Sequence, residues 1–248
     1  MAASKSISIE ILGVRFDLVG FHQAAGIVCD WLKDGKKRHI TTPNPEFVVA
    51  AQKDDEFRDI LKNADLSITD GRGIQLAARF LGLPIPQRIT GTDFMQELCE
   101  KFAKLRVPIF LLGGRNGAAE KCAEKLKNKF PDLQIAGIFE GKANEAGDRE
   151  ATSTINATNA KVVFVAYGAP KQEKWIARNL PRLNSIKAAM GVGGAFDYIA
   201  GEITRAPIFM RKMGLEWLWR LFKQPGRFNR IFRAVVIFPL LVLKEKIG

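Results

Sequence analysis

The sequence has few of the residues that build disulfide frameworks and metal sites. Its 248 residues include 3 cysteines and 2 histidines, and the cysteines are scattered, without a CxxC pair. This scarcity excludes a disulfide scaffold and argues against a structural zinc site. No acidic pair of the DxD type stands out either. We therefore expect no bound metal, no cofactor and a reducing compartment.

Long apolar runs are also missing, although a helix needs about 20 apolar residues to span a bilayer. The best candidate is AVVIFPLLVL from Ala234, which is short and is interrupted by Pro239. The first residues, MAASKSISIEILGV, have neither the apolar core nor the cleavage site of a signal peptide. We expect a cytoplasmic protein that does not span a membrane, although contact with a membrane surface stays open.

Acidic residues are outnumbered by basic ones, 26 against 38, which leaves a net charge of +12. Such a balance indicates anionic partners, whether phosphates, an acidic membrane face or nucleic acid. Hydrophobic residues make up 47% of the chain, too many for a disordered protein. The length suits one large domain, or one domain with an appendage.

Strand-like runs alternate with helical runs along most of the chain. The segment ISIEILGVRFDLV alternates apolar and polar residues around Gly13 and predicts an N-terminal β-hairpin. Apolar strands separated by amphipathic helices predict an α/β fold with a doubly wound, mostly parallel sheet. The expected helices cover residues 21–33, 45–63, 73–81, 118–130, 144–156 and 171–180. We expect a catalytic core over residues 1–205 and a helical, basic and aromatic appendage over residues 206–248.

Five of the predicted strands end in polar or glycine-rich loops. These are TTPNPE at 41–46, TDGRG at 69–73, LGGRNG at 112–117, YGAPKQE at 167–173 and MGVGGAFD at 190–197. In an open α/β sheet, ligands bind outside the carboxyl ends of the strands, and glycine lets backbone N–H groups approach a phosphate. Together the loops predict a site for a nucleotide-sized anion.

Other interpretations of these segments remain open from the residues alone. The loop at 113–119 resembles a dinucleotide fingerprint, so an NAD(P)-dependent oxidoreductase is the main alternative, although a tight turn explains the same glycines. The charge alone would also suit a nucleic-acid binder. Asp70 and Asp197 are either helix caps and turn formers or site carboxylates. His22 and His39 have no evident partner in the sequence and are expected to be structural.

Several motifs, taken in their order and spacing, resemble the WecG/TagA/CpsF glycosyltransferase family. They are TPNPE at 42–46, DGRG at 70–73, GTDFM at 91–95, LLGG at 111–114, GAPKQExW at 168–175, GVGGAFDxxAGxIxRAP at 191–207 and GLEWLWRLxxxPxR at 214–227. The resemblance covers most of the chain. It implies an inverting, metal-independent transfer from a UDP-sugar to a polyprenyl-diphosphate-linked N-acetylglucosamine. N-acetylmannosamine or its uronic acid is the expected sugar, although Thr69, Arg72 and EGKA at 140–143 depart from the common pattern.

The resemblance also implies roles for individual residues. Asp70 becomes the catalytic base, Thr42 and Asn44 line the sugar pocket, residues 168–173 contact the donor, and Asp197 lies near the uridine. Together with the strand-end loops, this gives one set of candidate substrate-binding residues: Thr42, Asn44, Gly71, Gly73, Gly113, Gly114, Tyr167, Gly168, Pro170, Lys171, Gln172, Glu173, Gly193, Gly194 and Asp197.

The appendage repeats cations at helical spacing among aromatic residues. Arg220, Lys223, Arg227 and Arg230 fall on one face of a helix, and the remaining residues offer the apolar surface of an interfacial helix. A plain solvated face is the alternative, whereas the aliphatic share after Ala234 argues against nucleic acid. Because the implied acceptor is lipid-linked, we expect this segment to dock on an anionic membrane surface, at the inner face of the cell membrane. Its arginines, Arg220, Arg227 and Arg230, are expected to neutralise the leaving diphosphate. Homo-oligomerisation is left open.

Overall fold

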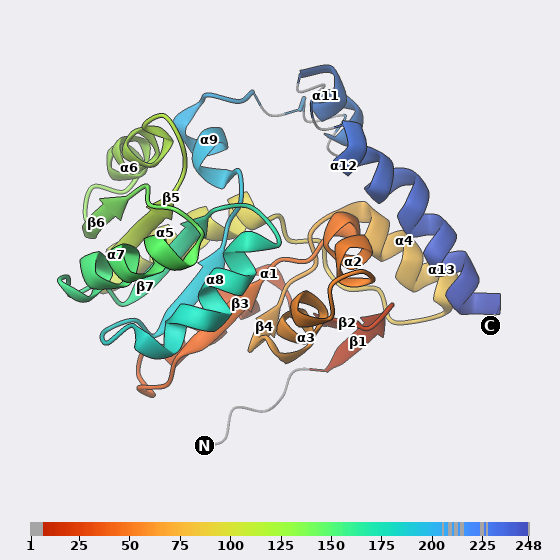
Figure 1. Cartoon of the computed structure of the whole chain (residues 1–248), viewed down its shortest axis with the longest axis horizontal. Coiled ribbons are helices and arrows are strands. Elements are labelled where there is room, and N and C mark those ends of the chain that lie inside the picture. The colour runs from red at the N-terminus through yellow and green to blue at the C-terminus, as the bar shows by residue number, and fades with distance from the viewer. Residues whose placement is uncertain are drawn as a thin grey trace.

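A parallel six-stranded sheet forms the centre of the molecule, and a separate two-stranded hairpin lies beside it (Figure 1). The computed structural model describes residues 7–204, 206–207, 210, 213, 216–223, 226 and 228–247. The sheet order is β4-β3-β8-β7-β5-β6, and each neighbouring pair is parallel. The strands are β3 (Arg38–Thr41), β4 (Leu66–Ser67), β5 (Ile109–Gly113), β6 (Ile135–Phe139), β7 (Val162–Ala166) and β8 (Ala188–Gly191). The expected fold class is confirmed.

The hairpin pairs β1 (Ser8–Ile11) with β2 (Val14–Asp17) in antiparallel register. Its turn residues Leu12 and Gly13 both have positive φ, at 51° and 76°. Two positive φ angles match the twist of a two-residue hairpin turn, which explains why glycine stands at this point.

Side chains of the sheet alternate between two buried layers. In β5, Ile109 and Leu111 face one layer while Phe110 and Leu112 face the other. The first layer is covered by α1 (Phe21–Trp31), α5 (Gly91–Leu105), α6 (Ala118–Lys129) and α9 (Ala195–Ala200). The second is covered by α7 (Glu145–Asn156) and α8 (Lys171–Asn179), which a 3-10 turn over Leu180–Arg182 follows. Apolar strands buried on both faces are what the sequence indicated.

A third apolar cluster joins the two ends of the chain. It contains the hairpin, α2 (Pro45–Ala51), α3 (Asp55–Asn63), α4 (Arg72–Leu81) and α13 (Phe238–Ile247). Phe238 and Val242 of α13 are buried in it. Ahead of α13 come α11 (Glu216–Lys223), α12 (Phe228–Phe232) and the π-helix η3 (Arg233–Ile237), and Figure 1 shows α13 running beside α4. The division at residue 205 stays a prediction.

Two helical expectations need correction. The helix expected over 45–63 is two helices, α2 and α3, because the Asp54 side chain accepts a hydrogen bond from the Phe57 N–H and starts a new helix. The 15-residue helix α5 was not expected at all. Its start is marked by Thr90, whose hydroxyl oxygen accepts from the Asp93 N–H, a capping arrangement that the sequence TGTD at 90–93 encodes.

Candidate active site

The loops singled out in the sequence meet at one edge of the sheet. Parallel strands end on the same side, and β4, β3, β8, β7 and β5 are consecutive neighbours. The loops at 69–73, 41–46, 190–197, 167–173 and 112–117 therefore follow one another across this edge. Open α/β sheets bind their ligands at such an edge. The structure thus brings the five predicted loops together.

Asp70 lies where the loops after β3 and β4 are joined. Its N–H donates to the Pro43 carbonyl at 3.0 Å, and the Ile68 N–H donates to the Thr41 carbonyl at 2.9 Å. The N-cap of α4 is Gly71, with φ +97°, so Asp70 precedes the cap and is not the cap itself. Asp70 is half-buried at the strand end, the position that a general base at this edge requires.

Gly73 shows how closely these two loops approach. A Cβ placed on Gly73 would lie 2.6 Å from Pro45 Cγ and 3.8 Å from Phe238 Cε1. The loop after β3, the start of α4 and the C-terminal helix α13 therefore meet at this point. The expected loop glycines have separate reasons, since Gly71 is required by its φ angle and Gly73 by the lack of space.

Thr42 and Asn44 both take part in local packing. The Asn44 side-chain oxygen accepts from the Phe47 N–H at 3.1 Å and caps α2. Thr42 is 6% exposed and lies against Gly91, the first residue of α5. Their expected contact with a sugar stays a prediction, and both lie at the correct edge for it.

Gln172 connects the loops after β7 and β8. Its side-chain Oε1 accepts from the Gly168 N–H at 3.0 Å and from the Gly193 N–H at 2.9 Å. Both glycines have positive φ, at 75° and 52°. The flanking candidates are Pro170 at the N-cap of α8, Lys171 as an exposed first residue of that helix, and Gly194 at the N-cap of α9.

Glu173 points into the protein and pairs with a histidine. Glu173 is fully buried, and its Oε2 lies 2.6 Å from Nε2 of His39, which is 8% exposed. The expectation that His39 lacks a partner is therefore wrong, and so is the same expectation for His22, whose Nδ1 lies 3.1 Å from Glu97 Oε1. The His39 pair joins residues 134 positions apart. No local sequence pattern reveals such a pair.

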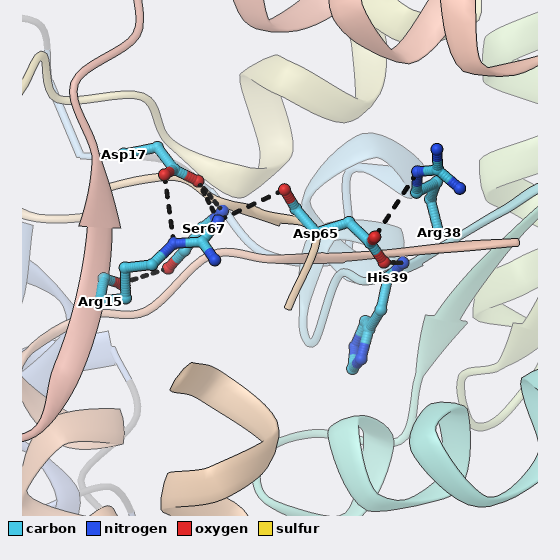
Figure 2. Close-up of polar contacts among 6 residues, drawn as sticks. All are labelled: Arg15, Asp17, Arg38, His39, Asp65 and Ser67. Atoms are coloured by element: carbon cyan, nitrogen blue, oxygen red, sulfur yellow. Dashed lines mark hydrogen bonds and ion pairs between the residues drawn. The ribbon is translucent and has the colours of Figure 1, made fainter. Parts of the chain in front are cut away.

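A second polar cluster holds the edge strand β4 in place (Figure 2). Asp17 of the hairpin accepts from the Ser67 N–H at 2.8 Å and pairs with Arg15 at 2.8 Å, while the Ser67 hydroxyl donates to the Arg15 carbonyl. On the other side, Asp65 Oδ2 accepts from the His39 N–H at 2.8 Å. The hairpin thus satisfies polar groups that an edge strand leaves open, and it supports the strand that leads to Asp70.

The loop after β5 is built almost wholly from positive φ angles. Gly113, Gly114 and Gly117 have φ of 92°, 85° and 74°, and Asn116 joins them at 54°. A Cβ on Gly113 would lie 2.9 Å from the Ala166 carbonyl carbon. This geometry is that of a tight strand-to-helix turn packed on β7, which accounts for the fingerprint-like glycines.

Tyr167 and Asp197 flank the glycine loops. Burial raises the pKa of the Tyr167 phenol, and the nearby carboxylates of Asp148 and Glu150 raise it further. Its buried hydroxyl has no hydrogen-bond partner within the described part of the chain. Asp197 is in the first turn of α9 and lies near Cys122 of α6, whose pKa burial raises to about 12, with a smaller contribution from Asp197.

Of the three arginines expected to serve the site, one has a described side chain. Arg230 of α12 forms an ion pair with Glu46 in the first turn of α2, directly after the loop that follows β3. The C-terminal segment therefore does reach this side of the sheet edge. Arg227 and the side chain of Arg220 lie outside the described residues.

Among the described residues, no three or more His, Cys, Asp or Glu side chains are grouped so that they could hold a metal ion. None of the helices in the described ranges is long and apolar enough to span a membrane.

Comparison with known proteins gives a consistent result. The Glycosyl transferase WecG/TagA/CpsF family matches residues 9–248. A Bacillus subtilis protein is 34% identical over 208 residues, which cover 84% of this chain and 79% of the relative. A Bacillus spizizenii protein is 32% identical over 216 residues, 87% of this chain and 82% of the relative. A Staphylococcus aureus protein is 30% identical over 249 residues, 98% and 95% of the two chains.

All three relatives are named N-acetylglucosaminyldiphosphoundecaprenol N-acetyl-beta-D-mannosaminyltransferase. The comparisons thus support the transferase interpretation and not the oxidoreductase alternative. With a family match over almost the full chain, and relatives that align over most of their own length, this protein is a glycosyltransferase and belongs to the WecG/TagA/CpsF family.

Proposed function

We propose that the protein transfers N-acetylmannosamine from UDP-N-acetylmannosamine to N-acetylglucosamine that is linked through a diphosphate to a polyprenyl lipid. The names of the relatives support the sugar and the acceptor. The observation that carries the proposal is the set of hydrogen bonds that connect the loops at the carboxyl edge of the sheet. There Asp70, tied to Pro43, lies at the end of β4, and Gln172 braces the Gly168 and Gly193 loops at the ends of β7 and β8.

In the proposed reaction, Asp70 acts as the general base. Its carboxylate takes the proton of the acceptor hydroxyl while that oxygen attacks the anomeric carbon of the donor sugar. The bond from the anomeric carbon to the diphosphate oxygen breaks, and UDP leaves with the bonding electron pair. One displacement inverts the anomeric configuration and needs one base, so no second nucleophilic carboxylate is required.

The leaving UDP carries negative charge that the protein must stabilise. Backbone N–H groups of the glycine loops and cationic side chains are suited to this, since pre-oriented donors stabilise charge that develops in a transition state. Arg230 is the described candidate because its pair with Glu46 holds it beside the loop after β3. We assign Arg220 and Arg227 to the same task on sequence grounds.

We place the protein at the inner face of the membrane, where a lipid-linked acceptor is met. The C-terminal helices expose large apolar side chains, among them Phe222, Phe228 and Leu240, at 76%, 57% and 58%. Lys244 and Lys246 are exposed on the same helix as Leu240. Apolar side chains with neighbouring lysines suit an anionic membrane surface.

A donor screen tests the proposed chemistry. Purified protein is incubated with a polyprenyl-diphosphate-linked N-acetylglucosamine and, in separate reactions, with different UDP-sugars or with NADH. We expect a lipid product and free UDP in equal amounts with UDP-N-acetylmannosamine. Transfer from another UDP-sugar alone would overturn the sugar assignment, and NADH binding without UDP binding would overturn the transferase site.

Vesicle sedimentation tests the membrane surface. Leu240→Glu should weaken binding to anionic vesicles about 10-fold or more, the scale of a leucine side chain that no longer enters an apolar phase. Leu105→Glu is the matched control, because Leu105 is 56% exposed but lies on α5. Equal losses for both variants, or no loss for either, would contradict the assigned surface.

A further inference from the structure

Beyond the residues assigned so far, a buried chain of polar side chains runs from the sheet centre to the Gly168 and Gly193 loops. We propose that the His39–Glu173 pair is a positioning device that fixes Gln172, and through Gln172 the two loops that hold the donor. The inference rests on the proposed function only in naming the donor as the ligand of these loops. It assigns a role to His39, which is hydrogen-bonded to Asp65 and Glu173.

The two backbone N–H groups fix the orientation of the Gln172 amide. Gln172 Oε1 accepts from two backbone N–H groups, so its Nε2 faces the other way and donates to Glu173 Oε1 at 3.0 Å. Glu173 Oε2 lies 2.6 Å from His39 Nε2, and the His39 tautomer with its proton on Nε2 donates to this oxygen. A flipped Gln172 amide would set an NH₂ group against both backbone N–H groups. Glu173 thus selects the one amide orientation that braces the loops.

Burial makes the other orientation of the Gln172 amide costly. Glu173 is fully buried and Gln172 is 2% exposed, so water cannot easily replace a lost partner. An unpaired buried charge is costly, which ties Glu173 to both of its donors. The last residue of β8, Gly191, has no room for a side chain beside them. A Cβ on Gly191 would lie 2.2 Å from Glu173 Oε1 and 2.4 Å from Gln172 Nε2. Gly191 is therefore required for packing and not for a positive φ.

His39 also holds the segment that leads into β4. Its backbone N–H donates to Asp65 Oδ2 at 2.8 Å and its carbonyl accepts from the Asp65 N–H at 3.0 Å, contacts that lie in the cluster of Figure 2. Asp65 immediately precedes β4, the strand that leads to Asp70. One hydrogen-bonded chain thus runs from Asp65, through His39, Glu173 and Gln172, to the glycine loops.

The test compares His39→Leu, which removes the donor, with His39→Gln, whose side-chain amide can still donate to Glu173. Asp148→Asn is the control, because Asp148 pairs with Arg178 at 2.7 Å and so holds the C-terminal end of the same helix α8, whereas Gln172 stands at its N-terminal end. Two quantities are measured in the full chain. One is amide exchange of Gly168 and Gly193 without ligand, and the other is kcat and donor KM in the transfer assay.

For His39→Leu we expect both amides to exchange about 10-fold faster, the scale of a lost buried hydrogen bond, while amides of β6 keep their rate. Donor KM should rise about 10-fold, with a smaller change in kcat. His39→Gln should restore both quantities to within about threefold of the parent protein. Asp148→Asn should lower the melting temperature without changing donor KM or the two amides.

The proposal is overturned if His39→Leu changes only the melting temperature, or if Asp148→Asn has the same effect on donor KM and the two amides. It is also overturned if His39→Gln changes donor KM and the two amide exchange rates as much as His39→Leu does. Failure of the parent protein to bind UDP would instead count against the proposed function, and the exchange rates would still decide whether His39 fixes the loops.

Discussion

Replacing Phe238 by alanine should destabilise the whole protein and not only its last helix. Phe238 is 2% exposed and lies in the cluster formed with α2, α3, α4 and the hairpin. It reaches Gly73, three residues after Asp70, where a Cβ would lie 3.8 Å from its ring. The C-terminal helix therefore packs directly on the segment that follows the proposed base, Asp70.

The size of the effect follows from burial. Removing a buried phenylalanine side chain costs about 3 to 5 kcal/mol, because the apolar contacts are lost and a cavity remains. For a chain of this length, each kcal/mol lowers the melting temperature by about 2 to 4 °C, so the expected fall is about 6 to 20 °C. Leu240→Ala on the same helix is the matched control. Leu240 is 58% exposed, and its loss should change stability by less than about 1 kcal/mol.

Denaturant unfolding, followed by tryptophan fluorescence, measures both variants against the parent protein. Amide exchange over residues 238–247 shows whether the helix separates first. If Phe238→Ala and Leu240→Ala have the same unfolding midpoint, α13 is not part of the cooperative core and the packing argument is refuted.

Two further predictions concern packing and protons. Gly73→Ala should cost about 1 to 3 kcal/mol because its Cβ would lie 2.6 Å from Pro45 Cγ, whereas Gly26→Ala, with nothing within 4 Å, should be neutral or stabilising in thermal melts. Burial raises the pKa of Cys122 from 9.0 to about 12, so the folded chain keeps a proton that the unfolded chain loses, and stability should fall as pH rises from about 9 towards 12. A thiol reagent at pH 8 should label only half-exposed Cys29 in the native protein, and labelling of Cys122 without unfolding would contradict this.

The strand-end loops were predictable because their signals are local. Apolar runs identify buried strands, and glycines after them identify turns, so the loops at 69–73 and 167–173 could be placed at one sheet edge. Helix starts were equally local. Asp54 and Thr90 are the N-cap residues of α3 and α5 and are of types that favour this position. The sequence prediction relied on hydrophobic periodicity instead, so it extended one helix through Asp54 and did not include the helix after Thr90.

Other features depend on contacts between distant segments. The Glu173–His39 pair spans 134 positions and the Arg230–Glu46 pair spans 184, so neither is visible as a spacing in the sequence. The inward direction of Glu173 could not be read either, since a glutamate in the first turn of a helix is ordinarily exposed. The sequence therefore indicated which loops form the site, but not which side chains brace it from within.

Single-turnover transfer with the Asp70→Asn variant tests the central claim most directly. Labelled UDP-N-acetylmannosamine is bound to saturation by the parent protein and by the variant, and transfer to the lipid-linked N-acetylglucosamine is timed. We predict that both bind UDP equally well and that the variant transfers sugar about 10²-fold more slowly or worse, the loss expected for a general base. Equal transfer rates, or a parent protein that binds UDP but transfers no sugar, would contradict the account.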